Sequence, residues 1–455
     1  MMWAYRISYA ISFCLAQAVG LVVPKVRRAI VGRRGLTARA AQACAHWPAG
    51  CARYWVHCAS SGEFEQALGV IEEIKKQNPH SRVFLTYFSP SAERAVTLEK
   101  MRRAQRASEL PWDAADYSPL DFPNCVRAFI RTIQPSVLAV MNREFWPELF
   151  QACVQNAVPI VVLAVYLPKG GAFLRWYRPW LNRVTHIAAT DAVTASAIRA
   201  TLSVPVSVMG DPRIQRIVQR RDWQMDRIEQ EWTRPERVFL AASLWPEDLK
   251  ALRPALDRLF SARPAWAVLL VPHEPHPSFV AQLEEVCLQA GVAVSRWSEN
   301  ATVPDTGAVI VDTVGGLAEL YRFASLAFVG GSFKARVHNV LEPAAYGTAI
   351  LTGPCIQNSL EAVQMAAREE GVRRAKDAQT LEYAVALALD NPDWVRTQGA
   401  KALYYVETRL GAGAEMAELV RKAALPVRPD QQADVVVSRP DVSGQTSGLV
   451  EYADA

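Results

Sequence analysis

Two series of short apolar segments, separated by one polar stretch, constrain the fold of this 455-residue chain more than any other feature. Longer segments with helical periodicity connect neighbouring members of each series. The first series comprises 54–56, 82–87, 137–141, 159–165, 186–189 and 206–209, and the second comprises 238–242, 266–271, 308–311, 326–329 and 349–351. Buried strands that alternate with helices are typical of a parallel sheet covered on both faces, so the sequence predicts two Rossmann-like α/β domains that face a cleft.

The expected domain limits follow from composition along the chain. Residues 1–34 form an apolar and basic leader, residues 35–218 a first domain, and residues 219–425 a second domain. The stretch 219–237, at the junction of the two domains, is charged and poor in strand-forming residues. Residues 426–455 are rich in Pro, Ser, Asp and Gln without periodicity, so we expect a disordered tail.

The leader has the composition of a membrane-associated helix. The apolar stretch from Ile7 to Val23 is closed by Pro24 and followed by a basic run at 25–28. At ~1.5 Å per residue its length is marginal for a ~30 Å hydrocarbon core, so both crossing the bilayer and lying in its interface are open. The basic run is the wrong flank for a cleaved signal peptide and favours a body on the cytoplasmic side.

The positive charge of the chain is concentrated near the N-terminus. The first 62 residues contain eight Lys or Arg and no acid, whereas the remainder contains 42 basic and 45 acidic residues. This distribution argues against a nucleic-acid-binding face and predicts contact between the leader and an anionic membrane surface. The eight cysteines show no C-x-x-C pair, which indicates reduced cytosolic thiols rather than disulfides or a zinc site.

The run His57-Cys58-Ala59-Ser60-Ser61-Gly62-Glu63 joins an apolar strand to a helix start, and Glu63 is the first acid of the chain. Free backbone N–H groups and the helix dipole favour an anion at such a turn. The spacing of Ser60 and Glu63 also fits a capping box, in which the two side chains only satisfy free amides. Both interpretations are open at this point.

Three further turns follow strands of the second domain. They are 272–274 after Val271, 312–316 after Val311, and 330–332 after Val329, the last leading to 338–342. Gly315-Gly316 can cradle a phosphate or form a simple turn, and Glu342 can accept both hydroxyls of a ribose or cap a helix with Asn339. Three such turns at strand ends of one domain together predict a nucleotide bound by base, ribose and phosphate.

In sequence order, these segments resemble the 3-deoxy-D-manno-octulosonic acid (Kdo) transferases. The resemblance runs from Trp55 to Leu419 and rests on H-x-x-S-x-G-E at 57–63, E-F-W-P at 144–147, G-D-x-R at 210–213, V-P-H at 271–273, D-T-x-G at 312–315, F-V-G-G-S at 328–332 and H-N-x-L-E-P-A-A at 338–345. It implies a GT-B glycosyltransferase of lipopolysaccharide biosynthesis at the cytoplasmic face of the inner membrane. The implied donor is CMP-Kdo, and the implied acceptor is the lipid A precursor, lipid IVA.

This chain departs from frequent family forms at four places. Asn142 stands where many members have the first acid of E-x-E-x-W-P, and Arg213 stands where many have Lys. Segment 272–274 replaces P-R-H, and segment 336–339 replaces G-G-H-N. These differences leave open the number of Kdo units added and the acceptor preference.

The residue types fit transfer with inversion at the anomeric carbon. Glu63 is the expected general base, Glu144 the residue that stabilises or orients the reacting centre, and Arg213, placed on a loop after Met209, a contact of the departing phosphate. The expected donor-binding residues are Pro272, His273, Glu274, Val314, Gly315, Gly316, Asn339, Val340, Leu341 and Glu342. The sequence contains no D-x-D pair, so we expect neither a metal ion nor a cofactor besides the donor.

Two other classes of function stay open from the sequence. One is another GT-B transferase or a sugar-nucleotide epimerase that uses a uridine nucleotide, because a fold does not fix its chemistry. The other is a membrane-anchored binding protein without catalytic activity. His57 and His338 are expected to be structural or hydrogen-bonding residues.

Overall fold

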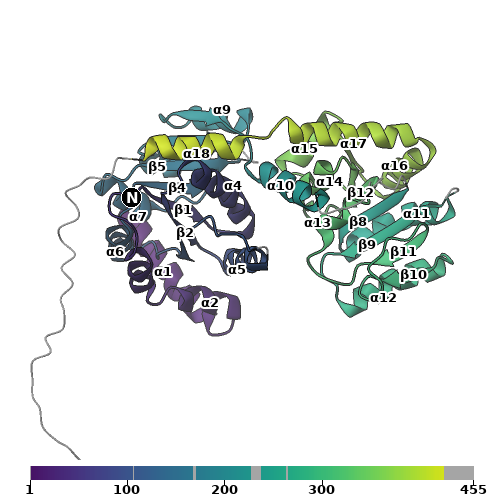
Figure 1. The fold of residues 1–455 in the computed structure, drawn as a ribbon, viewed down its shortest axis with the longest axis horizontal. Helices are drawn as coiled ribbons and strands as arrows, with labels where there is room; N and C mark the ends of the chain where they lie inside the picture. Colours follow the sequence, from purple (N-terminus) through teal and green to yellow (C-terminus); the bar gives the residue numbers. More distant parts are fainter. Residues whose placement is uncertain (1, 106, 168–170, 227–236, 263–264, 425–455) are drawn as a thin grey trace, which may run out of the picture.

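Two parallel-sheet α/β domains lie side by side, joined by helix α10 (Arg213–Met225) (Figure 1). This computed structural model describes residues 2–105, 107–167, 171–226, 237–262 and 265–424. The predicted pair of Rossmann-like domains is confirmed. The predicted tail at 426–455 lies outside the described residues.

The sheet of the first domain has seven parallel strands in the order β3-β2-β1-β4-β5-β6-β7. Side chains alternate across it, so that Trp55 faces one hydrophobic core and Tyr54 and Val56 face the other. The strands are β1 (Arg53–Cys58), β2 (Arg82–Tyr87), β3 (Ala114–Tyr117), β4 (Val137–Met141), β5 (Ile160–Val165), β6 (His186–Ala189) and β7 (Val206–Val208).

Helices cover both faces of this sheet. One core contains apolar side chains of α3, α6, α7, α8 and α9, and the other contains side chains of α4, α5 and α18. The helices of this part of the chain are α1 (Met2–Gly20), α2 (Pro24–Gly32), α3 (Leu36–Cys44), α4 (Ser61–Gln77), α5 (Pro90–Gln105), α6 (Pro123–Ile133), α7 (Pro147–Gln155), α8 (Leu174–Leu181) and α9 (Ala192–Arg199).

The second domain repeats this architecture, with strand order β10-β11-β9-β8-β12-β13-β14 and all neighbours parallel. Its strands are β8 (Val238–Leu244), β9 (Ala267–Pro272), β10 (Val294–Arg296), β11 (Gly307–Ile310), β12 (Leu326–Val329), β13 (Ala349–Thr352) and β14 (Val372–Arg374). Its helices are α11 (Pro246–Ser261), α12 (Pro277–Gln289), α13 (Leu317–Leu320), α14 (Leu341–Ala345), α15 (Leu360–Ala367), α16 (Ala378–Asp390) and α17 (Pro392–Glu407).

The last helix, α18 (Ala412–Ala423), corrects the predicted domain limits. Met416, Ala417 and Val420 of α18 pack in a core of the first domain, on which Figure 1 shows this helix in yellow. Conversely, Ile214 and Ile217 of α10 pack among residues of the second domain. The limits 35–218 and 219–425 were therefore wrong at these two helices, because the chain crosses between the domains twice.

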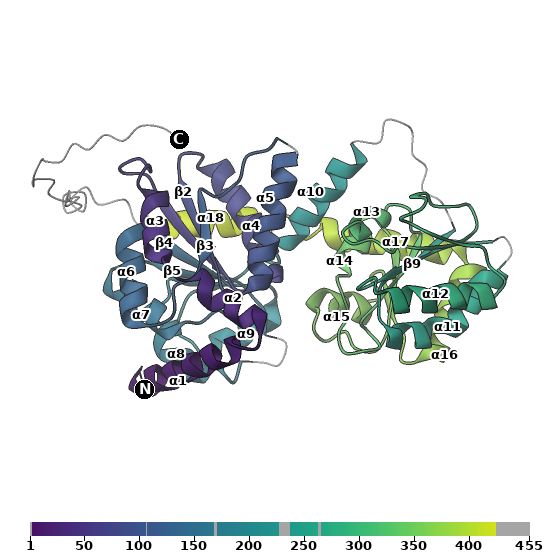
Figure 2. The same cartoon turned by 90° about the horizontal axis from the view of Figure 1, so that it is seen from below.

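The leader forms two helices that lie against the first domain (Figure 2). Tyr5 donates a hydrogen bond to Asp121 Oδ2 (2.6 Å), and Arg6 Nε pairs with Glu148 Oε1 (2.5 Å). Tyr9 stacks edge-on against Phe122. No helix among the described residues is long and apolar enough to cross a membrane. Helix α1 is thus attached along one face to the domain that follows it.

Candidate active site

Glu63 and Glu144 lie at the point where the strand order of the first sheet reverses. Glu63 is in the first turn of α4, directly after β1, and Glu144 follows β4. Strands β1 and β4 are parallel neighbours, so their carboxyl ends meet at one edge of the sheet. Ligands of doubly wound sheets bind at this reversal point, and the structure therefore brings the two predicted carboxylates to the expected place for chemistry.

Glu63 takes part in a capping interaction and is still accessible. Its Oε2 accepts a hydrogen bond from the backbone N–H of Ala59 (2.6 Å), and its own N–H donates to Ser60 Oγ (3.4 Å). Partial burial raises the pKa of Glu63, while the N–H groups of Ala59 and Ser60 oppose that rise. The Asn142 side chain provides a further hydrogen bond to the Glu63 carboxylate. A carboxylate has about four acceptor positions, so Glu63 keeps the capacity to accept a proton.

Glu144 is the more basic member of the pair. Burial, together with the negative charge of Glu63, raises its pKa to about 7, against a smaller opposing effect of a hydrogen bond from Trp146 Nε1 (2.9 Å). Asn142, on the same turn, has a left-handed backbone with φ +54°. Because burial and the charge of Glu63 favour the protonated form of Glu144, Glu63 is the carboxylate of the pair that is left ionised to act as the base.

His57 is buried behind Glu144. Trp55 Nε1 donates to Thr86 Oγ1 (2.8 Å), and that hydroxyl is 3.0 Å from His57 Nδ1, to which it can donate its hydrogen. The other ring nitrogen, Nε2, has no hydrogen-bond partner among the described residues and lies 3.9 Å from Glu144 Oε2. Burial lowers the pKa of His57 to about 3, so the ring stays uncharged at neutral pH.

Because the pKa of Glu144 is raised, we expect the stability of the fold to depend on pH through this residue. A carboxyl group whose pKa is raised by folding favours the folded state at low pH and loses that contribution as pH rises through its folded-state pKa. The Glu144→Gln variant should therefore gain stability relative to the native chain as pH rises. The difference between their free energies of unfolding should grow by on the order of 2 kcal/mol from about pH 5 to about pH 8. Urea unfolding at both pH values measures this difference.

The matched control for this measurement is Glu407→Gln, at an exposed position near the end of α17. The ionisable groups that face Glu144 are Arg143, Glu63 and His57, and the Glu144→Gln variant keeps all three. For Glu407→Gln, we expect the difference in the free energy of unfolding from the native chain to be the same at both pH values. The same result for Glu144→Gln would contradict the raised pKa of Glu144.

The predicted donor residues gather at the carboxyl edge of the second sheet. Pro272 ends β9, and the ring of His273 stacks on Trp245 (centroids 4.7 Å apart) and on His338 (4.4 Å). Glu274 follows on the same exposed turn. Sequence reasoning missed Trp245, which follows β8, because no motif marks it. Its place at a strand end is the signal that could have identified it.

The glycine turn after β11 is open. Gly315 has a left-handed backbone (φ +104°), and a Cβ built at Gly315 or Gly316 would contact nothing within 4 Å. Val314 is 85% exposed. The helix that follows, α13, has four residues, which is too short to provide a helix N-terminal site for a phosphate. The turn offers space to a ligand rather than preformed contacts.

In the segment from Asn339 to Glu342, the residues differ in what they can contact. Asn339 Oδ1 accepts a hydrogen bond from Leu341 N–H (3.0 Å), which fulfils the capping interpretation for Asn339. Val340 and Leu341 are buried in a hydrophobic core, so only their backbone atoms are available to a ligand. The carboxylate of Glu342 accepts a hydrogen bond from the Asn339 side chain. Its Oε1 lies 3.8 Å from Arg220 NH1 of α10.

Arg213 differs from its predicted setting. It is the first residue of α10 and does not lie on a loop. Its guanidinium pairs with Asp211 Oδ2 (2.6 Å) and with Glu361 Oε1 of α15 (3.0 Å). These two carboxylates neutralise Arg213 in the structure and so weaken its attraction for a phosphate.

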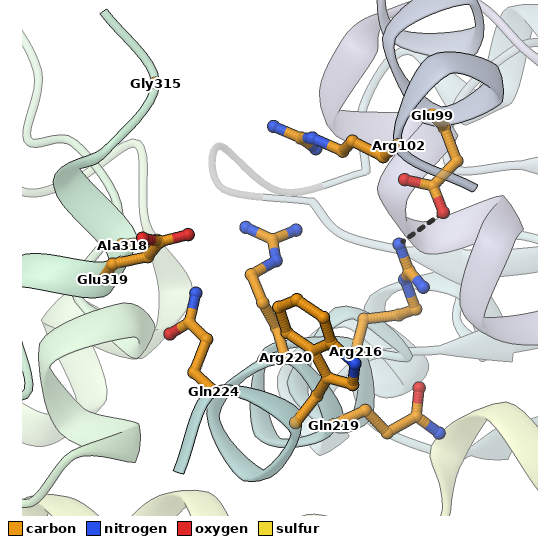
Figure 3. Close-up of a pocket in the computed structure, with 10 residues that line it drawn as sticks. Glu99, Arg102, Arg216, Gln219, Arg220, Gln224, Gly315, Ala318 and Glu319 are labelled. Atoms are coloured by element: carbon orange, nitrogen blue, oxygen red, sulfur yellow. Dashed lines mark hydrogen bonds and ion pairs between the residues drawn. The ribbon is translucent and has the colours of Figure 1, made fainter. Parts of the chain in front are cut away.

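A cavity of about 260 Å³ lies between the two domains, beside α10 (Figure 3). Glu99 and Arg102 line it from α5, and the segment from Gly315 to Glu319 lines it from the second domain. Arg216 binds Glu72 of α4 (2.7 Å) and Glu99 (3.5 Å). Sequence reasoning missed this cluster, because its acids and bases lie far apart in the chain.

Comparison with known proteins relates this site to one family. The family model described as "3-Deoxy-D-manno-octulosonic-acid transferase (kdotransferase)" matches residues 29–216. A 3-deoxy-D-manno-octulosonic acid transferase of Haemophilus influenzae is 26% identical over 353 residues, covering 74% of this chain and 79% of the relative. That of Bordetella pertussis is 28% identical over 350 residues, covering 73% and 78%.

Over most of its length, the chain is similar to Kdo transferases. Kdo transferases are glycosyltransferases, so these matches identify the chain as an enzyme, and the alternative of a binding protein without catalytic activity is set aside. Among solved structures, UDP-GlcNAc 2-epimerase from Neisseria meningitidis aligns with TM-score 0.55 at 12% identity, covering 82% of this chain and 99% of that one. A glycosyltransferase from Rickettsia africae aligns with TM-score 0.53 at 11% identity, with the same coverage. These likenesses confirm the two-domain GT-B fold.

Proposed function

We propose that this enzyme transfers Kdo from CMP-Kdo to the lipid A precursor, lipid IVA, with inversion at the anomeric carbon. The observation that carries the proposal is the position of Glu63 beside Glu144 at the strand reversal of the first domain. The nucleotide then binds the second domain across the cleft, at the turns after β9, β11 and β12. The similarity to Kdo transferases supports Kdo as the sugar that is transferred.

In this reaction, a hydroxyl oxygen of the acceptor forms a bond to the anomeric carbon of Kdo. The bond between that carbon and the phosphate oxygen breaks, its electron pair leaves with CMP, and Glu63 takes the hydroxyl proton. Glu144, held by Trp146, keeps a second carboxyl group next to the base, and the charge of Glu63 helps to raise the pKa of Glu144. No metal ion or cofactor takes part in the proposed steps.

We further propose that α1 lies in the interface of the inner membrane, at the cytoplasmic face. One face of α1 is attached to the first domain, and the opposite face presents apolar side chains to solvent at intervals of four residues, namely Trp3, Ile7, Ile11, Leu15 and Val19. Amphipathic helices with basic flanks bind anionic lipid surfaces in this orientation. Tyr9 contacts Trp146, so the membrane surface would lie close to Glu144.

Polar substitution of the exposed face should separate membrane binding from chemistry. We expect the combined variant Trp3→Ser, Ile7→Gln, Ile11→Gln and Leu15→Gln to pellet less with anionic vesicles and to become more sensitive to salt. Turnover should fall on acceptor in vesicles and persist on acceptor in detergent micelles, which present the lipid without requiring attachment.

The control variant carries Leu288→Gln and Tyr383→Gln, at exposed apolar positions of the second domain (66% and 62%). Deleting residues 1–34 is a weaker test, because Arg33 donates to the carbonyl oxygens of Ser118 and Phe88 and so supports the first domain. Equal loss of turnover in vesicles and micelles would contradict an anchoring role for α1.

Donor selection tests the proposed reaction against its alternative. The alternative is a GT-B transferase or sugar-nucleotide epimerase that uses a different nucleotide sugar, and the fold alone allows it. Calorimetry of the full chain with CMP and with UDP, followed by turnover with CMP-Kdo and with UDP-N-acetylglucosamine, distinguishes the two. Binding of CMP and turnover of CMP-Kdo are expected. Preference for UDP, or epimerisation of the uridine sugar, would support the alternative.

A further inference from the structure

A stack of three rings lies at the strand reversal of the second sheet. Trp245 follows β8, His273 follows β9, and His338 lies in the loop after β12, where β8 and β12 are parallel neighbours on either side of the reversal. Trp245 Nε1 donates to His338 Nε2 (3.1 Å), which leaves the ring hydrogen of neutral His338 on Nδ1 as a free donor. The stack is thus a polar and aromatic platform at the edge where ligands of such sheets bind.

The loop from Gly331 to His338 is held in one conformation. The fully buried carboxylate of Asp248 accepts hydrogen bonds from the N–H groups of Gly331 (2.6 Å) and Phe333 (3.0 Å). Gly331 has φ +75°, and a Cβ there would lie 2.3 Å from the carbonyl oxygen of Arg336. Only glycine fits this turn, and the buried anchor fixes where the following side chains begin.

Two cations project from this loop without an acidic partner. Lys334 and Arg336 are exposed, and neither has an ion pair within the described parts of the chain. Lys334 Nζ lies 3.3 Å from the centre of the Trp245 ring, at one end of the stack. Desolvation lowers the pKa of His273, the charge of Glu274 opposes this shift, and the charges of Arg336 and Lys334 add to it. Arg336 also helps to lower the pKa of His338. Both cations therefore lie close to the platform.

We infer that Lys334 and Arg336, with His338 Nδ1, form a clamp for an oxyanion of the donor nucleotide. The ligand chemistry is a phosphate ester or a sugar carboxylate, and the nucleotide phosphate is the favoured source. The inference rests on the proposed function and names the residues that bind the donor's charge. It differs from the sequence prediction, which gave this task to Arg213 and to the Gly315-Gly316 turn.

The change of charge on the phosphate during the transfer step favours Lys334 and Arg336 as its contacts. When the bond between the anomeric carbon and the phosphate oxygen breaks, a singly charged diester becomes a doubly charged monoester. Cations without a competing carboxylate stabilise that developing charge more than cations already paired, such as Arg213 with Asp211 and Glu361. Lys334 and Arg336 meet this condition on a rigid loop.

The test measures nucleotide binding and does not depend on turnover. Full-length native protein, Lys334→Gln, Arg336→Gln and the double variant are titrated by calorimetry with CMP and with cytidine. We expect the double variant to bind CMP at least tenfold more weakly and cytidine within twofold of the native protein, with a smaller dependence of CMP affinity on salt. Lys250→Gln, on the exposed face of α11, is the control and should leave both affinities unchanged.

The outcomes separate the inference from the proposed function. If the native protein binds CMP and the double variant binds CMP equally well, a third titration with CMP-Kdo decides. A tenfold loss for CMP-Kdo alone assigns the clamp to the sugar carboxylate, and no loss overturns the inference while the proposed function stands. If the native protein prefers UDP to CMP, the proposed function itself is wrong.

Discussion

Glu63→Gln should lower turnover by about 10²–10⁴-fold and leave both the fold and CMP affinity unchanged, because a general base contributes that much to a proton-transfer step. The amide oxygen of Gln can still accept the hydrogen bond from Ala59 N–H, so the helix start keeps its cap. What the variant loses is only the capacity to take the hydroxyl proton. Single-turnover kinetics with CMP-Kdo and lipid IVA, paired with calorimetry of CMP, measure the two effects separately.

Ser60→Ala is the matched control for this prediction. It removes the other half of the cap, the hydrogen bond from Glu63 N–H to Ser60 Oγ (3.4 Å). We expect a loss of roughly 0.5–2 kcal/mol in the free energy of unfolding and little change in turnover. The reverse pattern, in which Glu63→Gln keeps near-normal turnover and Ser60→Ala destabilises the fold, would mean that Glu63 only caps α4.

Glu342→Ala should weaken CMP binding by roughly 10–100-fold, since a charge-assisted contact to the two ribose hydroxyls is lost. In the structure this carboxylate is partly buried and lies 3.8 Å from Arg220, the nearest cation. Calorimetry with CMP measures the change. Uridine monophosphate, with the same ribose, should lose affinity in parallel if it binds at all.

Arg220→Gln isolates the ribose contact from the ion pair. This variant also removes the pair between α10 and Glu342, but it keeps the carboxylate free to accept hydrogen bonds from the ribose. We expect it to bind CMP about as well as the native protein. Unchanged CMP affinity in Glu342→Ala would remove this residue from the donor site. Equal weakening in both variants would show that the ion pair between Arg220 and Glu342 matters rather than the ribose contact.

The sequence predicted the buried strands well and missed three others. The predicted segments 186–189 and 326–329 coincide with β6 and β12, because central parallel strands are apolar on both faces. The strands missed, β3, β10 and β14, each lie at an edge of a sheet. Edge strands have a neighbour on one side only, so a short polar segment such as Val294–Arg296 carries no apolar run to reveal it.

The site was predictable to the extent that its residues follow strands. Glu63, Glu144 and His273 each come directly after a central strand, and parallel strands place such residues at one edge. Contacts between segments far apart in the chain could not be predicted, because no motif or periodicity marks them. Neither the return of α18 to the first domain nor the engagement of Arg213 by Glu361 could be derived from spacing.

The mass of the lipid product tests the central claim most directly. Full-length protein is incubated with lipid IVA and CMP-Kdo in detergent micelles, and the lipid is examined by mass spectrometry while released CMP is quantified. We predict a lipid heavier by one or more Kdo units, with one CMP released for each unit added, and loss of both signals in Glu63→Gln. Unchanged lipid mass with the native protein, under conditions in which it binds CMP, would contradict the proposed transfer to this acceptor.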